Sequence, residues 1–246
     1  MSFNRFLTTT FTAFFLVAAL LQVALADFTA TRTFDYFSKN TYQDKDWNVM
    51  FYANCDLPSW KALQWVEEGG ERFLRFTLKH NDVGGCGTDN QARNRGPWWE
   101  RAEIKQAHGL ERNRNYSFTY RVRFVKGFDT DRENFLQVHQ TVSGCRQSPL
   151  IMGKFNNGFL EGSFPLVRIA DYRGRWLDVR LDFNPSSHFD LYLDGKKVIE
   201  GQGTRREAYA ACVPHLKLGI YRPGSKRTKG DRLSVMDIDK LKLVDR

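Results

Sequence analysis

Apolar and polar residues alternate with a period of two along much of this chain. The longest unbroken run covers residues 116–124, where aromatic residues and Val122 occupy alternate positions and Ser117, Thr119 and two arginines occupy the positions between them. Shorter runs of the same kind cover residues 74–78, 177–183 and 189–193. Because the side chains of a strand point alternately to its two faces, these runs predict β-strands with one apolar face each.

Turn-forming residues separate these runs, and helical periodicity is scarce. Gly69-Gly70, residues 184–187 and Asp194-Gly195 stand between or just after the predicted strands, where a chain reversal needs positive φ or a fixed proline φ. One short helical turn is expected at residues 204–211, which begin with the spacing of a capping box. About a dozen strands with one apolar face each must pack as two layers, which predicts an all-β fold: a concanavalin-like β-jelly roll sandwich of two antiparallel sheets with little helix.

The first 26 residues differ in composition from the rest of the chain. They carry a single charge, Arg5, followed by a run rich in Phe, Leu, Ala and Val that ends in Ala24-Leu25-Ala26. This pattern is typical of a secretory signal peptide with a small-x-small cleavage site. The alternative is a membrane anchor, which is disfavoured because the apolar stretch is shorter than the roughly 20 residues of a spanning helix. We therefore expect a secreted or periplasmic protein with one domain at residues 27–246 and no stable membrane insertion after signal removal.

Four cysteines follow the predicted signal: Cys55, Cys86, Cys145 and Cys212. An even number in an exported chain indicates two disulfides, with three possible connectivities. We expect Cys55 to pair with Cys86 and Cys145 with Cys212, because Cys145 follows one predicted polar strand and Cys212 precedes another. Zinc binding is disfavoured, since the cysteines form no CxxC pair and no histidine stands at ligand spacing from one.

The chain is basic, with a formal net charge of +9. A basic balance favours a polyanionic partner. An exported protein is more often exposed to an acidic polysaccharide or an anionic cell surface than to nucleic acid. The basic residues are also spread along the chain rather than gathered into one arm, which disfavours nucleic acid as well. The alternative is that the basic charge serves solubility alone. We expect an acidic polysaccharide partner, no nucleic acid, and a monomer.

Three short segments, at residues 101–105, 137–139 and 217–221, each place polar residues on one face of a predicted strand. Arg101, Glu103 and Lys105 alternate with Ala102 and Ile104, Gln137 and His139 flank Val138, and Lys217 and Tyr221 alternate with Leu218 and Ile220. Arginine, glutamine, histidine and tyrosine supply a carboxylate partner, a neutral donor, a group that titrates near neutrality and a phenolic acid. On one shared face this set suits proton abstraction next to a carboxylate. For any single strand, a polar face turned to water is the simpler alternative.

These three segments, in this order, resemble the signature strands of jelly-roll polysaccharide lyases, a group that includes alginate lyases, glucuronan lyases and heparin lyase I. Residues 175–177 and 193–198 add a similarity to the heparin lyase I and glucuronan lyase branch. Two positions depart from the alginate lyase pattern: Ala102 stands where Ser or Thr is usual, and the third segment ends in Ile220-Tyr221-Arg222 rather than in a Tyr-Asn-Gln type. The resemblance therefore points away from alginate and implies glucuronan, a heparin-like chain or a bacterial exopolysaccharide as substrate.

The resemblance implies cleavage by β-elimination at a uronate. Arg101 and Gln137 would neutralise the uronate carboxylate, because its α-proton is too weakly acidic unless the developing charge meets fixed donors. His139 would act as the base or as a further neutralising group, and Tyr221 as the acid or as both base and acid. Syn elimination can use one group whereas anti elimination needs two, and the sequence leaves this choice open.

Six further residues complete the expected site as substrate-binding residues: Glu103, Lys105, Lys217, Arg222, His80 and Arg95. Glu103 would act by pairing with Arg101 or Lys105 to orient them, since another anion beside the substrate carboxylate opposes catalysis. His80 and Arg95 flank a long polar loop. No cofactor and no catalytic metal is expected, and a structural calcium is left open.

Two other functions remain as alternatives. A lectin-like carbohydrate-binding protein would use the same groove but would not need Tyr221 and His139 together. A glycoside hydrolase on the same fold would use two carboxylates about 5–9 Å apart. The chain has no Glu-x-Asp-x-x-Glu strand, and we interpret residues 237–239 as part of a sheet-edge strand rather than a site.

Overall fold

The computed structural model describes residues 41–43, 50–53, 62–79, 98–106, 108–125, 128, 132–140, 145, 148–163, 165–205, 212–224 and 233–246. They belong to one compact unit that spans Phe34–Arg246. The predicted signal peptide, the predicted Cys55–Cys86 pair, His80, Arg95 and most of the predicted helical turn lie outside the described residues. Among the helices of the described part, none has the length and apolar character needed to cross a membrane.

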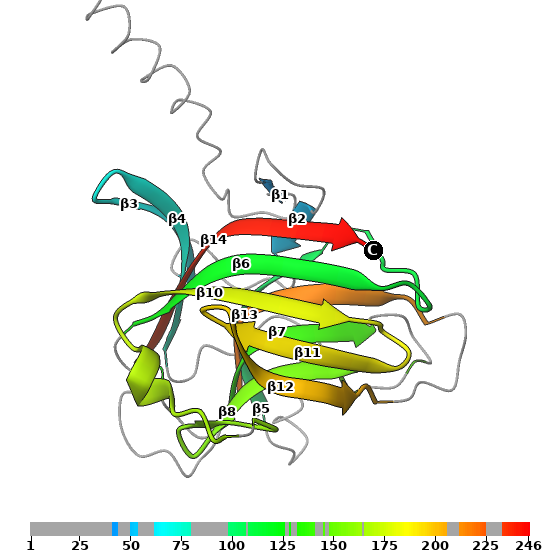
Figure 1. The fold of residues 1–246 in the computed structure, drawn as a ribbon. Coiled ribbons are helices and arrows are strands. Elements are labelled where there is room, and N and C mark those ends of the chain that lie inside the picture. The colour runs from blue at the N-terminus through cyan, green and yellow to red at the C-terminus, as the bar shows by residue number, and fades with distance from the viewer. Residues whose placement is uncertain are drawn as a thin grey trace, which may run out of the picture. The chain divides into compact units, whose positions relative to one another are not determined.

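The described strands form two sheets of seven strands each (Figure 1). The first sheet has the order β1 (Thr41–Gln43), β2 (Met50–Ala53), β5 (Trp98–Gln106), β13 (Pro214–Gly224), β7 (Glu133–Gln140), β8 (Ile151–Asn156) and β9 (Phe159–Leu160). The second has the order β12 (Lys196–Gly203), β11 (His188–Leu193), β10 (Trp176–Phe183), β6 (Tyr116–Phe124), β14 (Leu233–Asp245), β4 (Glu71–Lys79) and β3 (Leu63–Glu68).

All neighbouring strands in these two sheets are antiparallel. A short 3₁₀ helix, η2, spans Ile169–Tyr172 before β10. The prediction of an all-β jelly-roll sandwich of two antiparallel sheets with little helix is therefore confirmed.

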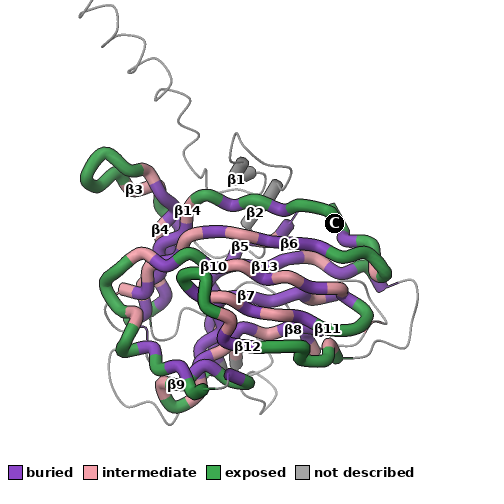
Figure 2. Tube along the Cα trace, in the orientation of Figure 1, coloured by how far each residue is buried: buried purple, intermediate pink, exposed green. Residues whose placement is uncertain are grey.

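The apolar faces of the two sheets form one core. Buried residues recur along strands of both sheets (Figure 2). From β6, Phe118 and Val122 are fully buried, and from β13 of the other sheet Leu218 and Ile220 are fully buried as well. Burial of each such side chain contributes about 1.5–3 kcal/mol to folding. Because the core takes one face of each strand, alternation turns the other face of β13 and its neighbours away from the core.

The segment Asp237-Ile238-Asp239 does not lie at a sheet edge, so that expectation was wrong. It belongs to β14, which pairs with β6 on one side and β4 on the other. Asp237 is fully buried and accepts hydrogen bonds from Arg75 Nε at 2.7 Å and Arg123 Nε at 2.9 Å. Alternating aspartates suggest an exposed edge, but arginines on both neighbouring strands compensate these carboxylates in a central strand.

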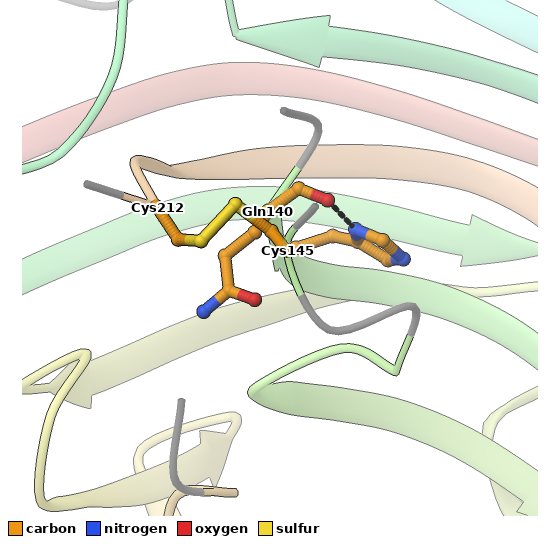
Figure 3. Close-up of a disulfide and its surroundings, with 4 residues drawn as sticks. Gln140, Cys145 and Cys212 are labelled. Atoms are coloured by element: carbon orange, nitrogen blue, oxygen red, sulfur yellow. Dashed lines mark hydrogen bonds between the residues drawn. A yellow bond between two sulfur atoms is a disulfide. The ribbon is translucent and has the colours of Figure 1, made fainter. Parts of the chain in front are cut away.

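A disulfide joins Cys145, just after β7, to Cys212, just before β13, with a Cα–Cα distance of 5.8 Å. Figure 3 shows it beside Gln140, the last residue of β7. This half of the predicted connectivity is confirmed. The bond closes a loop between two strands that carry predicted site residues, which restricts how far their ends can separate.

Candidate active site

The three predicted polar segments lie on β5, β13 and β7, with β13 between the other two. The register pairs Arg101 with Tyr221, Lys105 with Lys217, Lys217 with Gln137, and His139 with His215. Residues directly opposite each other on neighbouring strands share a face of the sheet. The structure therefore brings Arg101, Gln137, His139, Tyr221, Glu103, Lys105 and Lys217 onto one surface, which we call the polar floor.

Glu103 holds two residues of the polar floor in place. Arg101 Nη1 donates to Glu103 Oε2 at 2.9 Å, and Gln137 Nε2 donates to Glu103 Oε1 at 2.5 Å. All three side chains are buried, and hydrogen bonds to an ionised group are the stronger kind. Glu103 thus pairs with Arg101, as its predicted role in orienting Arg101 requires. It also holds the amide of Gln137 on β7, which is separated from β5 by β13.

Tyr221 is half-buried, and three neighbours define its position. Its ring stacks on Trp99 with centroids 4.9 Å apart and an interplanar angle of 17°. The guanidinium carbon of Arg101 lies 4.4 Å from the centroid of the same ring, a cation–π distance. The backbone carbonyl of Tyr221 accepts a hydrogen bond from Asn134 Nδ2 at 2.8 Å.

A glycine allows this close approach of β13 to β5. Gly219 has a φ of +135°, and a Cβ atom there would lie 2.2 Å from the carbonyl oxygen of Ala102. The register between β13 and β7 also shifts between Leu218 and Tyr221. Only glycine accommodates both the backbone angle and the contact, so the sequence at this position determines how Tyr221 meets Arg101.

His139 is partly exposed on the polar floor, and its Nδ1 forms a hydrogen bond with the backbone carbonyl of Gln140. A carbonyl oxygen only accepts, so Nδ1 carries the proton. In the neutral imidazole this leaves Nε2 unprotonated. An unprotonated Nε2 is the state that a general base requires.

Arg222 does not reach the polar floor, and its predicted contact with substrate is withdrawn. Its side chain is fully buried on the core side of β13, where it pairs with Glu100 and Glu133. The physical reason is strand alternation, which puts residue 222 on the face opposite Tyr221. The sequence already contained this signal, since residue 222 has the parity of Leu218 and Ile220.

A profile of the polysaccharide lyase family matches residues 53–237, which covers more than half of the chain. This chain belongs to the polysaccharide lyase family. A search of curated protein sequences finds no match.

Two solved structures show how the fold of this polysaccharide lyase compares with others. The alginate lyase AlgAT5 from polysaccharide lyase family 7 superposes with a TM-score of 0.54 at 14% identity, over 76% of this chain and 83% of that one. The alginate lyase PA1167 from Pseudomonas aeruginosa superposes with a TM-score of 0.50 at 12% identity, over 75% of this chain and 86% of that one. At such identities the likeness concerns the jelly-roll fold alone.

Beside the polar floor of this lyase, on the same face of the sheet, lies one residue that sequence analysis missed, His215. It lies directly opposite His139 and is half-buried. Burial lowers the pKa of His215 below the ordinary 6.5, and the positive charges of Lys105 and Lys217 lower it further. The alternation that links Lys217 to Tyr221 also includes residue 215, so the pattern could have identified it.

We expect His215 to make the stability of this lyase depend on pH. Because its folded-state pKa is depressed, the unfolded chain takes up the proton first, and the free energy of unfolding falls as pH drops below about 6.5. The loss stops once pH is below the folded-state pKa. In His215→Gln this contribution is absent, so urea denaturation between about pH 7 and 5 should show a shallower decline in unfolding free energy than in the wild type.

The exposed His188 at the start of β11 offers a matched control. His188→Gln should keep the wild-type decline of unfolding free energy with pH. An equally steep decline in His215→Gln would contradict the assignment.

Proposed function

We propose that this polysaccharide lyase cleaves a uronate-containing acidic polysaccharide by β-elimination on its polar floor. The observation that carries the proposal is the arrangement of Arg101 and Gln137 on either side of Glu103, with Tyr221 against Arg101. This places a guanidinium, an amide and a phenol on one face. Lys105 and Lys217 add further positive charge to it.

In the proposed reaction, Arg101 and Gln137 meet the charge that develops on the uronate carboxylate. The C5 proton passes to the base, the electron pair of the C5–H bond forms the C4–C5 double bond, and the C4–O bond breaks. Tyr221 protonates the leaving oxygen. In neutral His139 the hydrogen bond from Nδ1 to the Gln140 carbonyl makes Nε2 the basic nitrogen, which supports His139 as the base for anti elimination. In syn elimination Tyr221 performs both transfers.

We propose glucuronan or another glucuronate-bearing chain as the substrate, rather than alginate. The support comes from the sequence, because Ala102 and Arg222 depart from the alginate lyase pattern and residues 175–177 and 193–198 resemble the heparin lyase I and glucuronan lyase branch. The likeness to alginate lyase structures concerns the fold and does not select a polymer. The predicted signal at residues 1–26 further supports action outside the cytoplasm, in the periplasm or the medium.

A panel of polymers tests this function. The protein lacking residues 1–26 is incubated with glucuronan, heparin, heparan sulfate, hyaluronan, alginate and pectate, and the ultraviolet absorbance of a new unsaturated uronate is followed. We expect a rise with a glucuronate polymer and none with alginate. A folded protein that binds one of these polymers without any rise in absorbance would instead favour a carbohydrate-binding module.

Affinity for the polymer should weaken as salt is added. The cations of the polar floor attract a polyanion through interactions that ions screen, with a Debye length of about 10 Å at 0.1 M and about 3 Å at 1 M salt. The Tyr221→Phe variant should bind the polymer that the wild type degrades without cutting it during the measurement. Calorimetric titration of this variant with the intact polymer should therefore give a dissociation constant several-fold larger at about 0.5 M than at about 0.05 M salt. A dissociation constant independent of salt would argue against a polyanionic substrate.

A further inference from the structure

A buried charged cluster lies behind the polar floor, in the core between the sheets. Arg222 Nε donates to Glu100 Oε2 at 2.5 Å, Arg222 Nη1 donates to Glu133 Oε1 at 2.7 Å and to Ser234 Oγ at 2.6 Å, and Ser234 Oγ also donates to Glu133. None of the four residues is more than 1% exposed. We call these four residues the Arg222 cluster. It joins β13, β5 and β7 of the first sheet to β14 of the second.

Each charged member of the Arg222 cluster precedes or follows a residue of the site in the sequence. Arg222 follows Tyr221, Glu100 precedes Arg101, and Glu133 precedes Asn134, the residue bonded to the carbonyl of Tyr221. The register pairs Tyr221 with Arg101 on β5 and with Asn134 on β7. The cluster therefore joins the three strands at the row that contains the proposed acid.

This row needs such support because the regular ladder is interrupted beside it. The β13–β7 register shifts between Leu218 and Tyr221, and the β7–β8 register shifts between Asn134 and Leu136. Backbone hydrogen bonds alone determine the position of a strand poorly at such irregularities. A guanidinium is a rigid planar donor that can hold several acceptors in fixed directions.

A gain in stability is a weak explanation for the cluster. Buried ion pairs are often no more stabilising than apolar side chains of the same size, because the charges lose their hydration. An apolar residue at 222 would continue the pattern of Leu218 and Ile220. We infer from the arginine at this position that the cluster serves to fix the positions of β13, β5 and β7 relative to one another.

We propose that Arg222 is a positioning residue that holds the backbone of β13 so that the Tyr221 hydroxyl meets the leaving oxygen. The proposal rests on the proposed role of Tyr221. Arg222 itself does not touch the substrate. Its loss should impair the proton transfer while leaving the substrate contacts of the polar floor in place.

The first experiment compares Arg222→Lys with Asp237→Asn, which removes a charge from another fully buried ion-pair group, in the second sheet. At a temperature where both variants are folded, we expect Arg222→Lys to lower kcat about 10- to 100-fold with KM nearly unchanged, since small misplacements of a reacting group have effects of this size. Asp237→Asn should keep kcat within about two-fold of the wild type while losing stability. An unchanged kcat in Arg222→Lys, or equal losses of kcat in both variants, would overturn the proposal.

A double variant tests whether Arg222 acts through Tyr221. In the Tyr221→Phe background, Arg222→Lys should change the residual rate by less than about two-fold, because residues that act as a unit are not additive. A further loss as large as in the wild-type background would show that Arg222 acts by another route and would overturn the proposal. If Arg222→Lys does not fold, Ser234→Ala, which removes one partner of both Arg222 and Glu133, replaces it in both comparisons with the same expectations.

A measurement without turnover separates this proposal from the proposed function. In protein labelled with fluorotyrosine, the fluorine resonance of Tyr221 is assigned by its disappearance in Tyr221→Phe. Arg222→Lys should shift that resonance and Asp237→Asn should not, whether or not a substrate has been found. A resonance that stays in place in Arg222→Lys would overturn the positioning role, whereas a shift in a protein that cleaves no polymer would contradict only the proposed function.

Discussion

Replacing Tyr221 by phenylalanine is expected to reduce turnover by about 10²–10⁴-fold, the usual contribution of a general acid or base. The variant loses only the phenolic oxygen and its transferable proton. The ring keeps its stacking on Trp99 and its contact with the Arg101 guanidinium. KM and the unfolding midpoint should therefore stay close to the wild-type values, which steady-state kinetics and thermal denaturation measure.

Tyr192 provides a matched control for this substitution. It lies on β11 in the second sheet, and the guanidinium carbon of Arg180 lies 3.8 Å from the centroid of its ring, so its environment resembles that of Tyr221. Tyr192→Phe should leave kcat unchanged. Near-normal turnover in Tyr221→Phe would show that the polar floor is not the active site.

Replacing Gly219 by alanine is expected to cost about 3–5 kcal/mol of unfolding free energy and most of the activity. The methyl group meets the Ala102 carbonyl at 2.2 Å, and φ at this position is +135°. An unfavourable φ and overpacking each cost about 1–3 kcal/mol. Relief of the contact requires β13 to move away from β5, which separates Tyr221 from Arg101. Urea denaturation and the initial rate on the polymer measure the two effects.

A substitution at Gly195 measures how much unfolding free energy a positive φ costs when the new methyl group has no close contact. Gly195 has a φ of +74°, and a Cβ atom there would have no neighbour within 4 Å. Gly195→Ala should cost only about 1–2 kcal/mol and leave turnover intact. Equal losses of stability in the two alanine variants would contradict the close approach of β13 to β5.

Alternation in the sequence predicted the strands well because each strand buries only one face. The run at 116–124 corresponds to β6, with the same first and last residues. The same rule placed Arg101, Gln137 and Tyr221 on a common side of their strands. Applied to every residue of β13, the same rule would have placed His215 on the face of Tyr221 and Arg222 on the opposite face. Both errors arose because the alternation was not followed along the whole strand.

Other features depend on which strands become neighbours, and no local pattern contains that information. Glu103 contacts Gln137 because β13 lies between β5 and β7, close enough for side chains two strands apart to meet. Asp237 is buried because arginines of β4 and β6 flank β14. The partners that compensate buried Asp237, Arg75 and Arg123, are more than 100 residues away in the sequence, so the pattern of one segment cannot predict them.

Labelling of the solvent oxygen distinguishes elimination at a uronate from hydrolysis. The protein is incubated with the polymer that it degrades in water enriched in ¹⁸O, and the products are analysed by mass spectrometry. Elimination breaks the C4–O bond without adding water. Products quenched before the reducing-end hydroxyl exchanges with solvent should therefore lack one water relative to hydrolysis products and carry no ¹⁸O at the new ends. Products with ¹⁸O at the new reducing end and no unsaturated uronate would show hydrolysis and rule out elimination.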